Sequence, residues 1–318
     1  MQNLRIVYLG TPDFAVEPLR RLLEKQRACD SCGYEIVGVI TMPDKMISKR
    51  GNQLLMSPVK QYAVEQGLPV LQPVSLKDEA FQSELRAWGA DLQIVVAFRM
   101  LPESVWNMPR LGTFNLHASL LPQYRGAAPI NWAVMNGDHE TGATTFMLQH
   151  EIDTGNIILQ ERLPIAADEN VGSVHDRLML MGAGLVTRTV DAIIEADNQG
   201  LPVHTVPQDN TIELLPAPKI FKDTCAINFS QSAEQVRNHI RGLSPYPAAW
   251  ISQMPLSHPL AELLQGAKVY KAAVTQHAEQ KGHIIVPCAD GYIDLLELQL
   301  PGKKRMEAAA LLNGLKNK

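Results

Sequence analysis

Two polar side chains lie close together in the stretch NLHASLLP, which covers residues 115–122. Side chains alternate across a strand, so Asn115 and His117 share one face of the strand predicted here. Parallel sheets bury both faces, so two polar side chains on one face need hydrogen-bond partners or a ligand. Open α/β sheets bind ligands at the carboxyl ends of their strands, where this pair is expected. The alternative is a histidine that a backbone carbonyl satisfies inside the core.

A carboxylate follows in the stretch EIDTGN, between two apolar runs. Asp153 lies in a segment that Gly155 marks as a turn. A carboxylate close to an imidazole orients the ring and stabilises its charged form. A plain turn without a chemical role is the alternative interpretation of this segment.

The four cysteines do not form a framework or a metal site. Cys29 and Cys32 form an isolated C-x-x-C, and Cys225 and Cys288 stand far from it and from each other. We therefore expect reduced thiols and no metal ion.

Short apolar runs rich in β-branched residues alternate with helical stretches in the first half of the chain. The predicted strands are residues 4–9, 35–41, 92–97 and 113–117. The predicted helices are residues 14–26, 57–67 and 76–88. A strand pair near 143–149 and 156–163 and a long helix over 171–197 follow. This alternation predicts an α/β fold with a parallel sheet that helices cover on both faces.

The composition changes after Gly200, where residues 201–218 carry four prolines and predict a semi-rigid linker. Beyond the linker we expect one helix over 232–242 and several short strands, near 249–253, 267–275, 283–288 and 291–299. This pattern predicts a small barrel-like β domain. The expected organisation is a first domain over 1–200, the linker, and a second domain over 219–318.

The chain has 318 residues, of which 46% are hydrophobic and 19% are charged, as in a globular protein of two domains. No apolar run is long enough to span a bilayer, and the N-terminus lacks the pattern of a signal peptide. We therefore expect a cytoplasmic protein without a membrane partner, and a monomer. The net charge of −4 does not exclude a polyanion, which binds to local cations.

A polar, basic, glycine-containing segment follows the second predicted strand, in the stretch DKMISKRGNQLLMSPVK. We expect an exposed loop whose Lys49 and Arg50 contact an anionic partner. A solvated loop is the alternative.

Together these stretches resemble the folate-dependent formyltransferases. The resemblance rests on GTPDF at residues 10–14, NLHASLLPQYRGAAPI at 115–130 and IDTGNI at 152–157. The basic segment, RGLSPYPAAW at 241–250 and PGKKRMEAAALLNG at 301–314 are similar to the branch of the family that acts on tRNA. The resemblance implies a Rossmann-like formyltransferase domain, a linker and a C-terminal barrel resembling an OB-fold. It also implies transfer of a formyl group from the co-substrate 10-formyltetrahydrofolate to methionyl initiator tRNA.

The resemblance also assigns site residues. It implies that Asn115, His117 and Asp153 are catalytic. The residues expected beside the folate are Ser119, Leu120, Leu121, Pro122, Phe98, Met100 and Leu101. The residues expected to contact tRNA are Arg50, Lys49, Lys303 and Lys304.

Two other functions are compatible with parts of the pattern. A formyltransferase that acts on an amino sugar or another small amine would share the catalytic residues but lack the basic loop and the linker-joined barrel. A non-catalytic RNA-binding protein would use the barrel, although this segment shows little interleaving of aromatic and basic residues.

Overall fold

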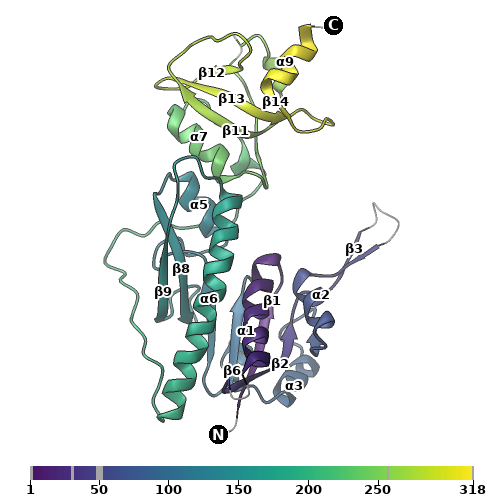
Figure 1. Ribbon diagram of the computed structural model, residues 1–318, viewed down its shortest axis with the longest axis vertical. Helices are drawn as coiled ribbons and strands as arrows, with labels where there is room; N and C mark the ends of the chain where they lie inside the picture. Colours follow the sequence, from purple (N-terminus) through teal and green to yellow (C-terminus); the bar gives the residue numbers. More distant parts are fainter. Residues whose placement is uncertain (1–2, 30–31, 48–52, 256–257, 317–318) are drawn as a thin grey trace. The chain divides into compact units, whose positions relative to one another are not determined.

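A computed structural model describes residues 3–29, 32–47, 53–255 and 258–316 (Figure 1). The chain divides into two compact units. Unit 1 comprises Met1–Arg125, Gly142–Leu163 and Asp176–Leu215, and unit 2 comprises Gly126–Thr141, Pro164–His175 and Pro216–Lys318. Two segments that precede the predicted linker in sequence therefore belong to unit 2. The domain boundaries at residues 200 and 219 stay a prediction.

Unit 1 is built on a seven-stranded sheet with the strand order β5-β2-β1-β6-β7-β8-β9. The strands are β1 (Leu4–Gly10), β2 (Tyr34–Ile40), β5 (Val70–Leu71), β6 (Leu92–Val96), β7 (Thr113–His117), β8 (Glu140–Met147) and β9 (Ile157–Pro164). The first five in spatial order pair in parallel, whereas β8 is antiparallel to β7. The prediction of a largely parallel sheet in an α/β fold is confirmed.

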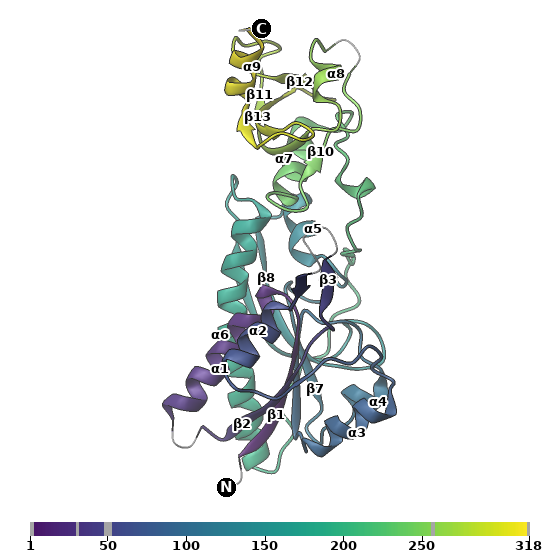
Figure 2. The same cartoon turned by 90° about the vertical axis from the view of Figure 1, so that its right-hand side faces the viewer.

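Helices cover both faces of this sheet, as Figure 2 shows. On one side lie α1 (Val16–Ala28) and α6 (Val171–Asn198), and on the other α3 (Glu79–Ala87) and α4 (Glu103–Trp106). Apolar residues four positions apart in α3, Phe81 and Leu85, are buried against the sheet because one helical face carries them. Although α6 has 28 residues, no helix in the described ranges is long and apolar enough to cross a membrane.

Several short elements of unit 1 were not predicted. They are β5, α4, and the strands β3 (Lys45–Ile47) and β4 (Gln53–Leu55), which form an antiparallel hairpin. The helix that follows the hairpin, α2 (Pro58–Glu65), was predicted. The basic segment is therefore a hairpin where it is described. Its Lys49 and Arg50 lie outside the described residues.

Unit 2 contains a five-stranded sheet in the order β10-β11-β13-β12, with β14 paired to β13. Its strands are β10 (Ala249–Trp250), β11 (Lys268–Thr275), β12 (Ile285–Pro287), β13 (Tyr292–Gln299) and β14 (Met306–Glu307). Its helices are α5 (Pro129–Met135), α7 (Ala233–Gly242), α8 (Ala261–Leu264) and α9 (Ala308–Lys316). The strands of this sheet pair antiparallel, which confirms the predicted C-terminal β domain.

Helix α7 begins at a capping box in which Ser232 and Gln235 satisfy each other's backbone N–H groups. Its end contacts α5, where the Asn131 amide donates to the carbonyl of Gly242 at 2.8 Å. A side chain at Gly242 would clash with Met135, so glycine permits the close packing of the two helices. Met135 of α5 thereby packs against the hydrophobic core of unit 2.

Candidate active site

Strand β7 places two of the predicted site residues at its carboxyl end. Asn115 lies opposite Val95 of β6 and Phe146 of β8, and His117 lies opposite Thr144. His117 is buried, with 7% of its surface exposed, whereas Asn115 is half-buried. Within the described residues the Asn115 side chain makes no hydrogen bond, so its amide remains available to a substrate.

The His117 ring has a different partner at each nitrogen. Its Nε2 lies 2.8 Å from the carbonyl oxygen of Tyr124, and because a carbonyl can only accept, Nε2 carries the proton. Its Nδ1 lies 3.8 Å from Oδ2 of Asp153, whose side chain is 12% exposed. That distance is too long for a hydrogen bond and suits an ion pair with a protonated ring. Asp153 and His117 are thus brought together, as the sequence predicts.

The backbone of the turn between β8 and β9 explains how Asp153 reaches the ring. Asp153 has φ +56°, a left-handed conformation that aspartate tolerates better than most residues. Two residues later, a Cβ at Gly155 would lie 1.6 Å from the carbonyl oxygen of Met147. Only glycine permits this approach, so the turn is fixed at both positions.

The segment that follows His117 is tightly bound to its surroundings. Ser119 donates to the carbonyl of Gln123 at 2.6 Å, and its own carbonyl accepts from Thr144. The Leu121 carbonyl accepts from Gln160 at 3.0 Å. The predicted folate contacts here differ in exposure, because Ser119, Leu121 and Pro122 are buried and Leu120 is half-buried.

The loop after β6 presents the other predicted folate contacts. Met100 is 76% exposed, Phe98 is half-buried, and Leu101 is buried in the core under α3. Arg99, between the first two, donates to the carbonyl oxygens of residues 73 and 74. Arg99 thereby links the loop to the segment after β5. Met100 is the large apolar side chain that the loop exposes.

Three residues of the site were not found from the sequence. Tyr124 contributes its backbone carbonyl, which contacts His117, and a backbone contact cannot be predicted from the pattern of side chains. Gln208 and Arg125 form a hydrogen-bonded pair across 83 residues, and the side chain of Gln208 is buried within the proline-rich segment. Its position between a proline and an aspartate gives no signal of burial.

Lys303 and Lys304, the predicted tRNA contacts of unit 2, are exposed in the turn between β13 and β14. The neighbouring Arg305 stacks on the ring of Tyr270, with 4.2 Å between the guanidinium carbon and the ring centroid. The two lysines therefore lie on an accessible surface beside a fixed cation.

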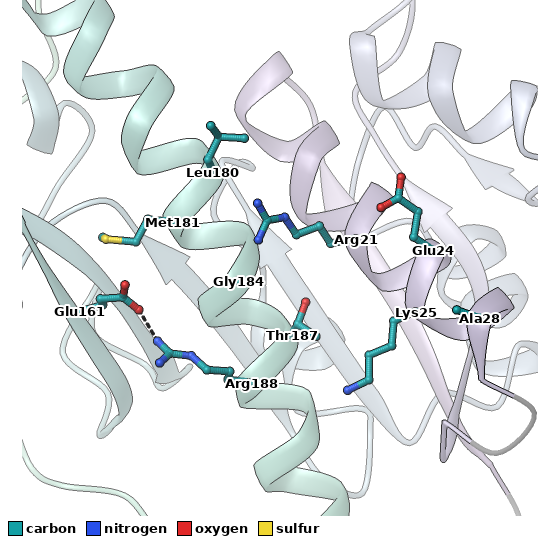
Figure 3. Close-up of a pocket in the computed structure, with 10 residues that line it drawn as sticks. All are labelled: Arg21, Glu24, Lys25, Ala28, Glu161, Leu180, Met181, Gly184, Thr187 and Arg188. Carbon is teal, nitrogen blue, oxygen red and sulfur yellow. Dashed lines mark hydrogen bonds and ion pairs between the residues drawn. The ribbon is translucent and has the colours of Figure 1, made fainter.

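A groove of about 710 Å³ lies elsewhere in unit 1, between α1 and α6 (Figure 3). Arg21 and Lys25 of α1 extend toward α6, whereas Arg188 of α6 points away from them and pairs with Glu161 of β9. No predicted site residue lines this groove, so the candidate active site is separate from it. In the described ranges, no group of three or more His, Cys, Asp or Glu residues could hold a metal ion.

Comparison with known proteins covers both halves of the chain. The model of the family described as "Formyl transferase" matches residues 4–190. The model described as "Formyl transferase, C-terminal domain" matches residues 219–316. The methionyl-tRNA formyltransferase of Parabacteroides distasonis is 57% identical over 325 residues, which cover 99% of this chain and 97% of that protein.

Two solved structures share the fold at low sequence identity. An N-formyltransferase from Helicobacter canadensis, in complex with folinic acid and dTDP-3-aminofucose, has a TM-score of 0.62 at 19% identity. It covers 92% of this chain and 98% of that one. HypX from Aquifex aeolicus, in complex with tetrahydrofolic acid, has a TM-score of 0.61 at 15% identity and covers 98% of this chain and 47% of that one.

Proposed function

Since this chain belongs to the formyl transferase family, we propose that it transfers a formyl group from 10-formyltetrahydrofolate to the α-amino group of methionyl initiator tRNA. The observation that carries this proposal is the 57% identity to a methionyl-tRNA formyltransferase along almost the whole of both chains. The arrangement of Asn115, His117 and Asp153 supports the same reaction. The product is N-formylmethionyl-tRNA, the form used to initiate translation.

The residues of the site suit the steps of this reaction. The α-amine attacks the formyl carbon, and the formyl oxygen becomes an oxyanion. The amide of Asn115 donates to that oxygen. Because Tyr124 occupies Nε2 of His117, the second donor is Nδ1, which carries a proton only in the charged ring. Each donor of this kind lowers the barrier by about 3 kcal/mol.

Asp153 compensates the positive charge of the ring, since its carboxylate lies 3.8 Å from Nδ1. At that distance the carboxylate accepts no direct hydrogen bond from Nδ1–H, so this N–H can donate to the substrate instead. The amine loses its proton through water that Asp153 organises. The bond between the formyl carbon and N10 then breaks, N10 takes a proton, and tetrahydrofolate leaves.

The folate is expected at the carboxyl ends of β6 and β7, where open α/β sheets bind ligands. The exposed Met100 and the half-buried Phe98 offer apolar contacts there. The buried side chains of Ser119, Leu121 and Pro122 offer few, so the apolar contact from this segment comes from Leu120. Lys303 and Lys304 bind phosphates of the tRNA, and Lys49 and Arg50 approach its aminoacyl end. The protein works as a monomer in the cytoplasm.

One experiment separates this function from its alternatives. The protein is incubated with 10-formyltetrahydrofolate and, separately, methionyl initiator tRNA, methionyl elongator tRNA or a nucleotide-linked amino sugar. We expect formylation of the initiator tRNA above all. Formylation of the sugar would indicate the amino-sugar activity, which the solved structure from Helicobacter canadensis makes a specific alternative. Binding of tRNA without any formylation would indicate the non-catalytic protein.

A further inference from the structure

Gln208 makes four hydrogen bonds beside the candidate active site. Its Nε2 donates to the carbonyl oxygens of Asp153 and Gly155, at 2.8 Å each. Its Oε1 accepts from Nε of Arg125 at 3.0 Å and from a terminal nitrogen of the same guanidinium at 2.6 Å. The residue is 7% exposed, so these bonds are made in a largely water-free environment.

Arg125 determines which way the amide of Gln208 points. A guanidinium can only donate, so the amide oxygen must face it and the amide nitrogen must face the two carbonyls. Each N–H of the Gln208 amide then has one acceptor, and its oxygen has two donors. Neither a carboxylate nor an apolar side chain of similar size could make all four bonds.

One of the two carbonyls belongs to Asp153, the residue with left-handed backbone, and the other belongs to Gly155, two residues later. Left-handed backbone at a residue other than glycine costs about 1 kcal/mol or more, and it persists where the surroundings fix it. Hydrogen bonds on both sides of Thr154 supply that constraint. They hold the carboxylate of Asp153 in the position from which it faces Nδ1 of His117.

The same proline-rich segment also holds the other partner of the ring. The N–H of Tyr124 donates to the carbonyl of Leu215 at 2.7 Å, and Gln123 bonds to residues 213 and 215 through its side chain. The backbone at residues 206 and 157 is joined by two hydrogen bonds of 2.8 Å. Residues 206–215 therefore contact both loops that contain the partners of His117.

From these contacts we infer that Gln208 is a positioning residue for formyl transfer, which acts through Asp153 and is itself oriented by Arg125. The inference rests on the catalytic role proposed above for Asp153. The segment after α6 is thus part of the active site and more than a connection between domains. Its function is to keep Asp153 and Tyr124 at fixed positions around His117.

The test is a double-mutant cycle between Gln208→Met and Asp153→Asn. Methionine keeps the approximate size of glutamine and removes all four hydrogen bonds. Asparagine removes the charge of Asp153 but tolerates its left-handed backbone. We expect Gln208→Met to lower kcat about 10- to 100-fold with little change in either KM, because a displacement of about 1 Å at a reacting group costs rate on this scale. In the Asp153→Asn background the same change should cost less than about threefold.

Two further variants complete the design. Gln199→Met, the same substitution at an exposed glutamine before this segment, should leave kcat unchanged. Gln208→Glu keeps the contact with Arg125 and places a carboxylate against the two carbonyls, so it should lower kcat in the same way. It also serves as the test if Gln208→Met does not fold.

The outcomes distinguish the inference from the function on which it rests. Wild-type kcat in Asp153→Asn would contradict the proposed role of Asp153 and, with it, the inference. A low kcat in Asp153→Asn beside unchanged kcat in both Gln208 variants would overturn the inference alone. Losses that multiply in the double variant would also overturn it, since they would show that Gln208 acts independently of Asp153.

Discussion

The Nε2–H of His117 donates to the carbonyl oxygen of Tyr124 over 2.8 Å, and Tyr124 has φ +60°. Because this hydrogen bond occupies Nε2, only Nδ1 can contact a substrate. A second donor on the ring therefore requires the charged imidazole, for which Asp153 supplies the opposite charge. The catalytic role proposed for His117 thus depends on a backbone contact seven residues later in the chain.

Replacement of His117 by alanine is predicted to abolish turnover and to leave tRNA binding almost intact. The side chain is buried at a strand end and offers the tRNA little exposed surface. Loss of one oxyanion donor costs about 10²- to 10³-fold in kcat. Single-turnover formylation and equilibrium binding of methionyl-tRNA measure the two effects. A large loss of binding would show a structural role for His117.

Replacement of Asn115 by alanine is predicted to lower kcat by about 10²-fold or more with little effect on stability. Loss of an oxyanion donor accounts for the rate. The amide has no hydrogen-bond partner in the described part of the chain, so its removal leaves no buried group unsatisfied. Thermal unfolding of the variant should be within about 2 °C of wild type. A strong decrease in Tm would mean that Asn115 supports the fold.

The sequence predicted the parts of this site that follow from periodicity. Alternation along β7 placed Asn115 and His117 on one face, and the βαβ rhythm placed them at a carboxyl edge. The pairing of Asp153 with His117 was expected from residue type and from the resemblance, and the structure brings them together.

The other parts depend on contacts that leave no local pattern. Every residue has a backbone carbonyl, and only the fold determines that the carbonyl of Tyr124 is the one that contacts His117. Gln208 lies in a segment whose prolines predict a linker, and long-range hydrogen bonds to Arg125 decide its burial. Likewise the packing of α5 on α7 depends on the absence of a side chain at Gly242.

Replacement of Gly155 by alanine is predicted to destabilise the protein by about 1–3 kcal/mol and to lower activity. The added Cβ would lie 1.6 Å from the Met147 carbonyl oxygen, so the turn that carries Asp153 must move. Gly314→Ala is the matched control, because nothing lies within 4 Å of its added Cβ and α9 favours alanine. Chemical denaturation and kcat measure both effects. Full stability in Gly155→Ala would show that the turn adapts without strain.

Joint replacement of Lys303 and Lys304 by alanine is predicted to weaken binding of methionyl-tRNA and to reduce its dependence on salt. Each lysine that neutralises a phosphate contributes about one to the slope of log K against log salt. Binding isotherms at several salt concentrations should therefore show a slope smaller by about two. Affinity for 10-formyltetrahydrofolate is the internal control and should not change. An unaltered slope would place the tRNA on another surface.

The ion pair between Glu297 and Arg305 is predicted to stabilise unit 2 at neutral pH and to be lost in acid. Two hydrogen bonds from the guanidinium, one of 2.6 Å, hold the pKa of the Glu297 carboxyl below its usual value. A lowered pKa in the folded state gives stability above the pKa of the unfolded chain, near 4.5. That stability is lost as the pH falls through the lower folded value.

Glu297→Gln removes the charge and tests whether the stabilisation is present at neutral pH and lost in acid. Because both groups are partly exposed, the difference in unfolding free energy at pH 7 should be only about 0.2–1 kcal/mol. Thermal unfolding of wild type and variant between pH 7 and pH 3 should show the two curves converging below about pH 4.5. A difference that stays constant into acid would mean that packing of the glutamate side chain, rather than its charge, stabilises the pair.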